Sequence, residues 1–363
     1  MSEARLNSLS PTSIGMEWRV GEIGGSEKMT IGGEYPSTPQ SESLFHSMGL
    51  LHIVSPFLPE LIATDFPVLP MAQLLTNELY KSKKRTPPEW KTPTGDTIDH
   101  STQIKGNHSL VTFSGGKDSL WNLMTATEAG ESPRAVHIQG LNEVVGRREH
   151  EDVLKQQKVI GFPLSVVVLK NSYTQKGQPS MQSRDLFLTA MAIPFAAEEG
   201  AGRIYLEGSF KEGASEQGAI FAHKLSTWQL YQAQLELMSI PIQMNGTNRG
   251  EIDSIKDLIE KQPSWLPLVS NCLAGEQKRT EVRKTMKSIA PSFPFYESQC
   301  GGCLKCMTLN LARIAYDPMV KRDAKAQDIK NYLGATVRWH RENKPKIGAY
   351  IDPGFEPLLA SLL

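Results

Sequence analysis

Short apolar runs alternate with longer amphipathic segments from Ser109 onward, and this alternation restricts the fold more than any other feature of the chain. Apolar runs of this length suit buried strands, and the segments between them suit helices. The predicted strands are Leu110–Phe113, Ala135–Gln139, Leu164–Leu169, Gly202–Glu207 and Ile240–Gln243. The predicted helices are Asp118–Glu128, Glu149–Ile160, Arg184–Glu199 and Ile252–Glu260. This order predicts an α/β fold with a parallel five-stranded sheet, helices on both faces and right-handed crossovers.

Residues 1–105 differ in composition from the rest of the chain. They are rich in Ser, Pro, Gly and Thr, as in GGEYPSTPQSES and KKRTPPEWKTPTGD, with short apolar pieces between these stretches. Such clusters favour turns and loops. We therefore expect an N-terminal extension or small subdomain over residues 1–105, either as a partner-binding arm or as a stabilising extension. A main domain over residues 106–320 and a helical tail over residues 321–363 are expected to follow.

Charge and hydropathy exclude several classes of protein. Lys plus Arg and Asp plus Glu both number 39, so the chain offers no broad positive field for nucleic acid. The most apolar stretch, Leu44 to Leu75, contains Glu60, Asp65 and four prolines, which argues against a membrane span. The N-terminal sequence MSEARLNSLS lacks a basic segment followed by an apolar run. We expect a cytoplasmic protein without a secretory signal.

The first strand-to-helix junction reads LVTFSGGKDS, and its chemistry favours an anionic ligand. Two glycines allow the backbone to approach a ligand closely. The following helix N-terminus offers N–H groups and the positive end of its dipole, which suit phosphate oxygens. The serines add hydroxyl groups, the lysine adds a positive charge, and the aspartate can position magnesium or cap the helix. The candidate phosphate-binding residues are Ser114, Gly115, Gly116, Lys117, Asp118 and Ser119.

The four cysteines all lie in the last third of the chain. Three occur in CGGCLKC, and the fourth lies 28 positions before the first of them. Disulfides would not persist in a reducing cytosol, whereas tetrahedral zinc takes four thiolates in a structural site. An iron–sulfur cluster accepts the same ligands, and unbound thiols for redox chemistry are a third interpretation. We favour structural Zn²⁺ bound by Cys272, Cys300, Cys303 and Cys306.

The glycine loop is not the Walker A pattern, which reads GxxxxGK[ST]. It resembles the SGGxDS signature of the PP-loop ATP pyrophosphatases, which cleave ATP to AMP and pyrophosphate. The resemblance implies the adenine nucleotide alpha-hydrolase (HUP-like) fold with ATP and Mg²⁺ as ligands. It also implies charge neutralisation by Lys117, a magnesium contact by Asp118, and adenine held by backbone groups from Val136 to Gly140.

Residues 109 to about 316 resemble the 7-cyano-7-deazaguanine synthase family more closely, because that family combines SGGxDS with a downstream cysteine triplet. CGGCLKCMTLNLAR is similar to the family's CGxCxxC ending, which implies a supporting role for Arg313. QSRDLF is similar to its helix that carries Arg–Asn, which implies that Arg184 lies near the phosphates. Asp185 replaces that asparagine, and Gly208–Gly213 replaces an acidic substrate segment. The wider cysteine spacing and the N-terminal extension also depart from the family.

These departures indicate a divergent relative, such as the forms found in bacterial anti-phage gene clusters or in modified-nucleobase biosynthesis. The resemblance implies an ATP-dependent ligase or synthase that adenylates a carboxylate or amide, with a 7-deazapurine acid as one candidate. Ammonia or an amine would displace AMP, and Arg184 or Lys211 would contact the phosphates or the substrate. An ATP-dependent sulfurtransferase and a non-catalytic ATP-binding partner protein stay open. A protein partner through residues 1–105 and a homodimer are compatible with the sequence.

Overall fold

The computed structural model divides into two units, which are described separately. The sheet unit comprises Met1–Phe113, Ala126–Arg147 and Phe162–Thr247, and the helical unit comprises Ser114–Thr125, Arg148–Gly161 and Asn248–Leu363. The structure describes residues 2–9, 14–21, 23–94, 107–140, 143–171, 182–209, 221–247, 250–270, 272, 276–347 and 351–363. Across these ranges, every helix is too short or too polar to cross a membrane.

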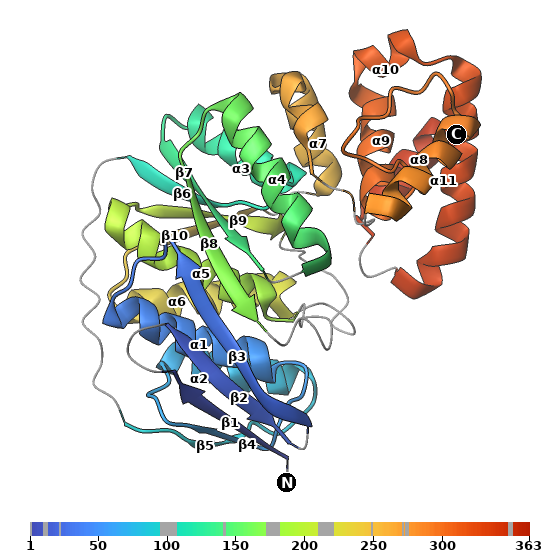
Figure 1. The fold of residues 1–363 in the computed structure, drawn as a ribbon. Helices are drawn as coiled ribbons and strands as arrows, with labels where there is room; N and C mark the ends of the chain where they lie inside the picture. The colour runs from blue at the N-terminus through green and yellow to red at the C-terminus, as the bar shows by residue number, and fades with distance from the viewer. Residues whose placement is uncertain are drawn as a thin grey trace. The chain divides into compact units, whose positions relative to one another are not determined.

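Four of the five predicted strands are present, a fifth follows just after its predicted position, and the five pair in parallel in the order β10-β9-β6-β7-β8 (Figure 1). Their bounds are β6 (His108–Thr112), β7 (Ser132–Gln139), β8 (Leu164–Asn171), β9 (Arg203–Ser209) and β10 (Gln243–Thr247). The last of them begins where the predicted strand Ile240–Gln243 ends. An α/β fold with a mostly parallel sheet is therefore confirmed.

The predicted number of strands is wrong, because the described residues form one sheet of ten strands. The N-terminal region adds β1 (Glu3–Ser8), β2 (Gly15–Val20), β3 (Ile23–Gly33), β4 (Leu61–Thr64) and β5 (Glu89–Lys91). β3 pairs antiparallel with both β8 and β2, and it thereby joins the two halves of the sheet. Its sequence, IGGSEKMTIGG, contains glycines that are typical of turns, so the local sequence pattern does not predict a strand. The strand forms because it pairs with β2 and β8.

Four helices share one hydrophobic core with strands from both halves of the sheet. They are α1 (Pro39–Val54), α2 (Pro70–Ser82), α5 (Arg184–Glu199) and α6 (Leu225–Leu237), with the short η2 (Phe221–His223) before α6. Thr38 begins α1 with a capping box, in which its Oγ1 accepts from the backbone N–H of Ser41 at 3.1 Å. α1 buries residues around most of its circumference, as expected for a helix enclosed in a core. Residues 1–105 therefore contribute to the main core of this unit.

His52 on α1 predicts that the stability of the protein depends on pH. Its ring is fully buried and stacks on Phe187 with a centroid separation of 5.5 Å. Burial, assisted by the positive charge of Arg184, lowers the pKa of His52 from 6.5 to about 4. The folded state therefore keeps the ring neutral, whereas the unfolded chain takes up a proton. The contribution of the neutral His52 ring to the free energy of unfolding is fully present above pH 6.5. It declines by up to about 3 kcal/mol as the pH falls toward 4.

Urea denaturation across this pH range tests the prediction. His52→Gln removes the titrating ring, so its free energy of unfolding should change less with pH than that of the wild type. His108→Gln alters an exposed histidine on β6 and should keep the wild-type pH dependence. Equal slopes for the wild type and His52→Gln would contradict the assignment.

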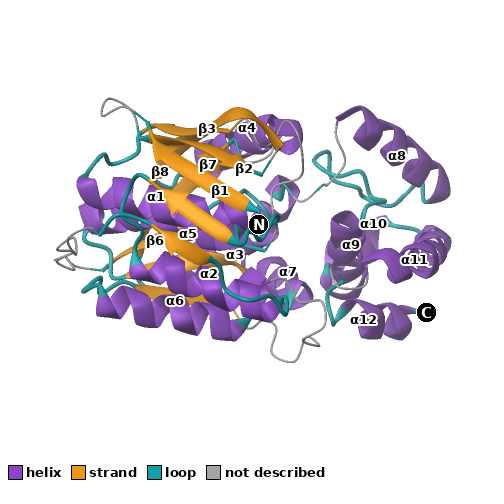
Figure 2. Cartoon of the chain, turned by 90° about the horizontal axis from the view of Figure 1, so that it is seen from below, coloured by secondary structure: helices purple, strands orange, loops and turns teal. Residues whose placement is uncertain are grey.

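The helical unit confirms a helical C-terminal region that contains the cysteines (Figure 2). Its helices are α7 (Glu251–Lys261), η3 (Pro263–Leu268), α8 (Glu276–Ile289), α9 (Leu304–Tyr316), α10 (Pro318–Asp323), α11 (Ala326–Ile347) and α12 (Phe355–Leu362). It also contains most of α3 (Lys117–Glu128) and of α4 (Glu143–Ile160). The indole N–H of Trp121 on α3 donates to Asp257 on α7 at 2.9 Å, which fixes these two helices side by side.

Candidate nucleotide loop and metal site

The loop Ser114–Ser119 is fixed by its own backbone and hydroxyl groups. The Ser114 N–H donates to Ser119 Oγ at 3.1 Å, and the Gly116 N–H lies 3.4 Å from Ser114 Oγ. Gly115 has a φ of 76°, where other residues are strained, and a Cβ added there would lie 2.8 Å from Gln156 Oε1. The glycine is therefore required both by the backbone conformation and by the close approach of α4.

Lys117, the first residue of α3, is 1% exposed and lies between two carboxylates. Its Nζ is 2.7 Å from Asp118 Oδ2 and 3.3 Å from Glu251 Oε2. Burial alone would lower the pKa of Lys117, but the charges of Asp118 and Glu251 outweigh it and raise the pKa. The side chain is therefore a buried, permanently charged ammonium group beside the candidate phosphate loop.

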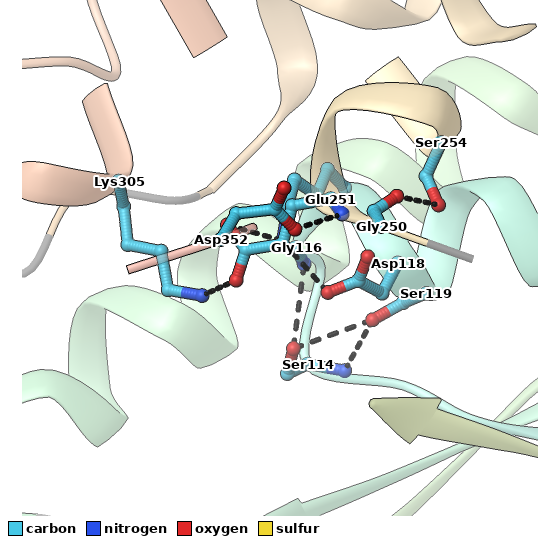
Figure 3. A network of polar contacts seen from close by, with 10 residues as sticks. Ser114, Gly116, Asp118, Ser119, Gly250, Glu251, Ser254, Lys305 and Asp352 are labelled. Atoms are coloured by element: carbon cyan, nitrogen blue, oxygen red, sulfur yellow. Dashed lines mark hydrogen bonds and ion pairs between the residues drawn. The ribbon is translucent and has the colours of Figure 1, made fainter. Parts of the chain in front are cut away.

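Glu251, at the start of α7, completes a network that the sequence did not reveal (Figure 3). Its second carboxylate oxygen pairs with Lys305 on α9. Burial would raise the pKa of Glu251, but Lys117 and Lys305 together lower it to about 2. Two cations thus hold one carboxylate ionised within the helical unit.

Asp352 supplies the N-terminal cap that α7 lacks in its own sequence. The residue before the helix is Gly250, which has no side chain to accept a hydrogen bond. Asp352 Oδ2 instead accepts from the Glu251 N–H at 2.6 Å, and its Oδ1 accepts from the Gly354 N–H at 2.7 Å. A segment 101 residues away in the chain therefore fixes the backbone of Glu251.

The remaining predicted ligand residues belong to the sheet unit. Val136 lies on β7 and is buried, and Gly140 follows that strand with a φ of 106°. A Cβ at Gly140 would lie 1.8 Å from the Leu169 carbonyl oxygen, so the close pairing of β7 with β8 requires glycine there. Arg184 begins α5 and pairs with Asp185 at 2.8 Å. Lys211 lies outside the described residues. Of the predicted nucleotide-binding residues that the structure describes, Ser114–Ser119 lie in the helical unit.

The four predicted metal ligands form one cluster, with all four Sγ atoms within 4.8 Å of one another. Cys300 and Cys306 lie 3.9 Å apart, close to the separation of about 3.8 Å that tetrahedral zinc–sulfur bonds of 2.3 Å require. The Cys303 N–H points to Cys300 Sγ at 3.3 Å, an arrangement that stabilises a thiolate. None of the four cysteines forms a disulfide.

The close approach of the four thiol groups also affects their protonation. The hydrogen bonds among the thiols, first that with Cys272, raise the pKa of Cys306 well above its usual range. Four adjacent thiolates therefore require a cation to neutralise them, and metal binding would release their protons. The cluster could thus hold a metal ion such as zinc.

Arg313 is a buried packing residue on α9, the helix that also carries Cys306. Its guanidinium is 1% exposed, donates to the Pro294 carbonyl at 2.8 Å and pairs with Asp317 at 3.2 Å. It also lies 3.8 Å from the centre of the Tyr296 ring. These contacts fix the chain just before Cys300.

The residues missed by sequence reasoning are Glu251, Lys305, Asp352 and Gln156. An acidic residue at the start of the helix after the fifth strand was the only local signal for Glu251, and it equally fits an ordinary first helical turn. Asp352 carries no local signal, because its role depends on a contact with Glu251, which lies 101 residues earlier in the chain.

A scan against protein-family models and a search of curated proteins found no match to this chain.

Proposed function

We propose that the loop Ser114–Ser119 binds the phosphates of ATP and that the protein adenylates a carboxylate or amide substrate. The observation that carries the proposal is the loop itself, a strand-to-helix turn with Gly115 at positive φ and a buried, charged Lys117 at the helix start. A helix N-terminus with an adjacent cation suits phosphate oxygens. Asp118 is one-third exposed and supplies a carboxylate oxygen of the kind that Mg²⁺ prefers.

The proposed reaction has two steps. An oxygen of the substrate attacks the α-phosphorus of ATP, the bond to the bridging oxygen breaks, and pyrophosphate leaves with its electron pair. Ammonia or an amine then attacks the adenylate carbon and expels AMP, with loss of one proton. Lys117 neutralises negative charge on the phosphates during the first step, and positioning supplies most of the remaining catalysis. A 7-deazapurine acid is the first substrate to test, and an anti-phage or modified-nucleobase pathway is the proposed setting.

The cysteine cluster is proposed to bind structural zinc. Four sulfur ligands leave no open coordination position, and three of the side chains are buried. Coordination of one metal ion by all four cysteines also weighs against a sulfurtransferase, because that enzyme needs a cysteine that is free to carry persulfide. Binding of ATP without turnover would instead favour the non-catalytic role.

Release of AMP and pyrophosphate from Mg²⁺–ATP tests the proposed function. We expect both products when 7-carboxy-7-deazaguanine and ammonium are present. Asp118→Asn should lower the rate by about 100-fold, because it keeps the side-chain shape but removes the charge that positions Mg²⁺.

Glu78→Gln is the matched control. It neutralises a carboxylate that likewise pairs with a lysine, Lys81 at 2.6 Å, but lies on the exposed surface of α2. This variant should retain the wild-type rate. ATP binding without AMP formation from this acid would refute the deazapurine substrate, and absence of ATP binding would refute the nucleotide loop.

A further inference from the structure

One face of α4 holds the segment that leads into the first metal ligand. The Arg148 Nη2 donates to the Cys272 carbonyl at 2.5 Å, and the Ser270 hydroxyl donates to Asp152 Oδ2 at 2.6 Å. The Gln156 Nε2 donates to the Leu268 carbonyl at 2.6 Å. The three α4 residues follow one another at intervals of four positions, so they lie on the same face of the helix.

The three contacts pair residues 268, 270 and 272 with α4 in the opposite chain direction, because they contact residues 156, 152 and 148 in succession. Four residues of α-helix rise about 6.0 Å, so the three side chains on α4 are evenly spaced along one face of the helix.

The same contacts reach the candidate nucleotide loop. The Gly115 carbonyl accepts from the Ser270 N–H at 2.9 Å and from Gln156 Nε2 at 2.8 Å. Gln156 is 1% exposed, and one amide nitrogen thus bridges the loop and the segment. Gly115 is the residue whose positive φ shapes the loop. Its position is therefore set by atoms two residues from a metal ligand.

We propose that Arg148, Asp152, Gln156 and Ser270 couple the metal site to the nucleotide loop. When the four cysteines hold a metal ion, Cys272 is fixed, Leu268 and Ser270 stay against α4, and Gly115 keeps its conformation. The cysteines thus act on the nucleotide without touching it. The inference rests on the proposed function for the identity of the ligand, although the coupling itself concerns only the loop. Thermodynamic linkage requires the effect to be reciprocal.

Hydrogen exchange of the backbone amides in residues 114–119 tests the coupling without nucleotide. We expect exchange to accelerate at least tenfold when zinc is removed with a chelator. Gln156→Met leaves the cysteines unchanged, so it should keep one zinc per chain. Because methionine has a similar shape but no hydrogen-bond donor, the zinc-loaded variant should show the same acceleration of loop exchange. Gln157→Met alters the next residue on α4 and should behave as the wild type.

A second measurement tests reciprocity with ATP itself. Zinc removal should weaken ATP binding by at least tenfold, and saturating ATP should strengthen zinc binding by the same factor in equilibrium competition with a chelator. Gln156→Met should reduce both effects to less than twofold. If loop exchange responds as expected but ATP binds neither form, the coupling stands and the proposed nucleotide is wrong. Unchanged loop exchange in the stripped protein would overturn the coupling, whatever Gln156→Met shows and whatever ligand the loop binds.

Discussion

Lys117→Met is expected to destabilise the protein by about 3 kcal/mol and to abolish AMP formation. The methionine has a similar length but no charge, so the variant leaves Asp118 and Glu251 without the cation between them. Removal of one member of a buried ion pair is costly, because the remaining charge stays poorly solvated. Lys305 still pairs with Glu251, which places the expected loss at the lower end of the usual range. Urea denaturation measures the stability, and AMP release measures the activity.

A double variant separates the two roles of Lys117. In Lys117→Met with Glu251→Gln, the more buried of the two carboxylates is neutral, while Asp118 and Lys305 are partly exposed and can be hydrated. We expect about 2 kcal/mol of the lost stability to return, with no recovery of AMP formation. If the double variant is stable and active, Lys117 has no role with ATP. If Lys117→Met is as stable as the wild type, the buried ion network does not form.

Local patterns predicted the parts of this protein that local interactions define. The strands from β6 to β9 are short apolar runs, and the loop at Gly115 joins one of them to a helix within a few residues. The cysteine triplet was likewise recognised from its regular spacing of three positions, and in the structure all four thiols lie in one cluster. Apart from Cys272, which lies 28 positions before the triplet, the residues that determine these features lie close together in the sequence.

Features that depend on distant partners were not predicted. β3 is rich in glycine, and its pairing with β2 and β8 makes it a strand. The environment of Lys117 depends on Glu251, which in turn depends on Asp352 for the cap of its helix. A resemblance to PP-loop enzymes assigns Lys117 to phosphates, but it does not reveal that the lysine is already held by carboxylates. The proposed binding of ATP would therefore have to compete with, or incorporate, this existing ion network.

Cys306→Ser is expected to lower the metal content from one zinc per chain to less than a tenth. Cys306 is fully buried at the start of α9, and a serine hydroxyl is a poor ligand because it stays protonated. A metal ion that binds the folded state and not the unfolded chain stabilises the fold, so the variant should melt at a lower temperature.

Elemental analysis and thermal melting with and without a chelator measure these effects. A chelator should lower the melting temperature of the wild type toward that of Cys306→Ser and leave the variant unchanged, because the variant has no metal to lose. Thr308→Ser removes one methyl group from a buried residue on the same helix and should keep the full zinc content. If elemental analysis finds iron and acid-labile sulfide in the wild type, the four cysteines bind an iron–sulfur cluster and not zinc. Metal-free wild-type protein that a chelator does not destabilise would show that the four thiols pack together without a metal.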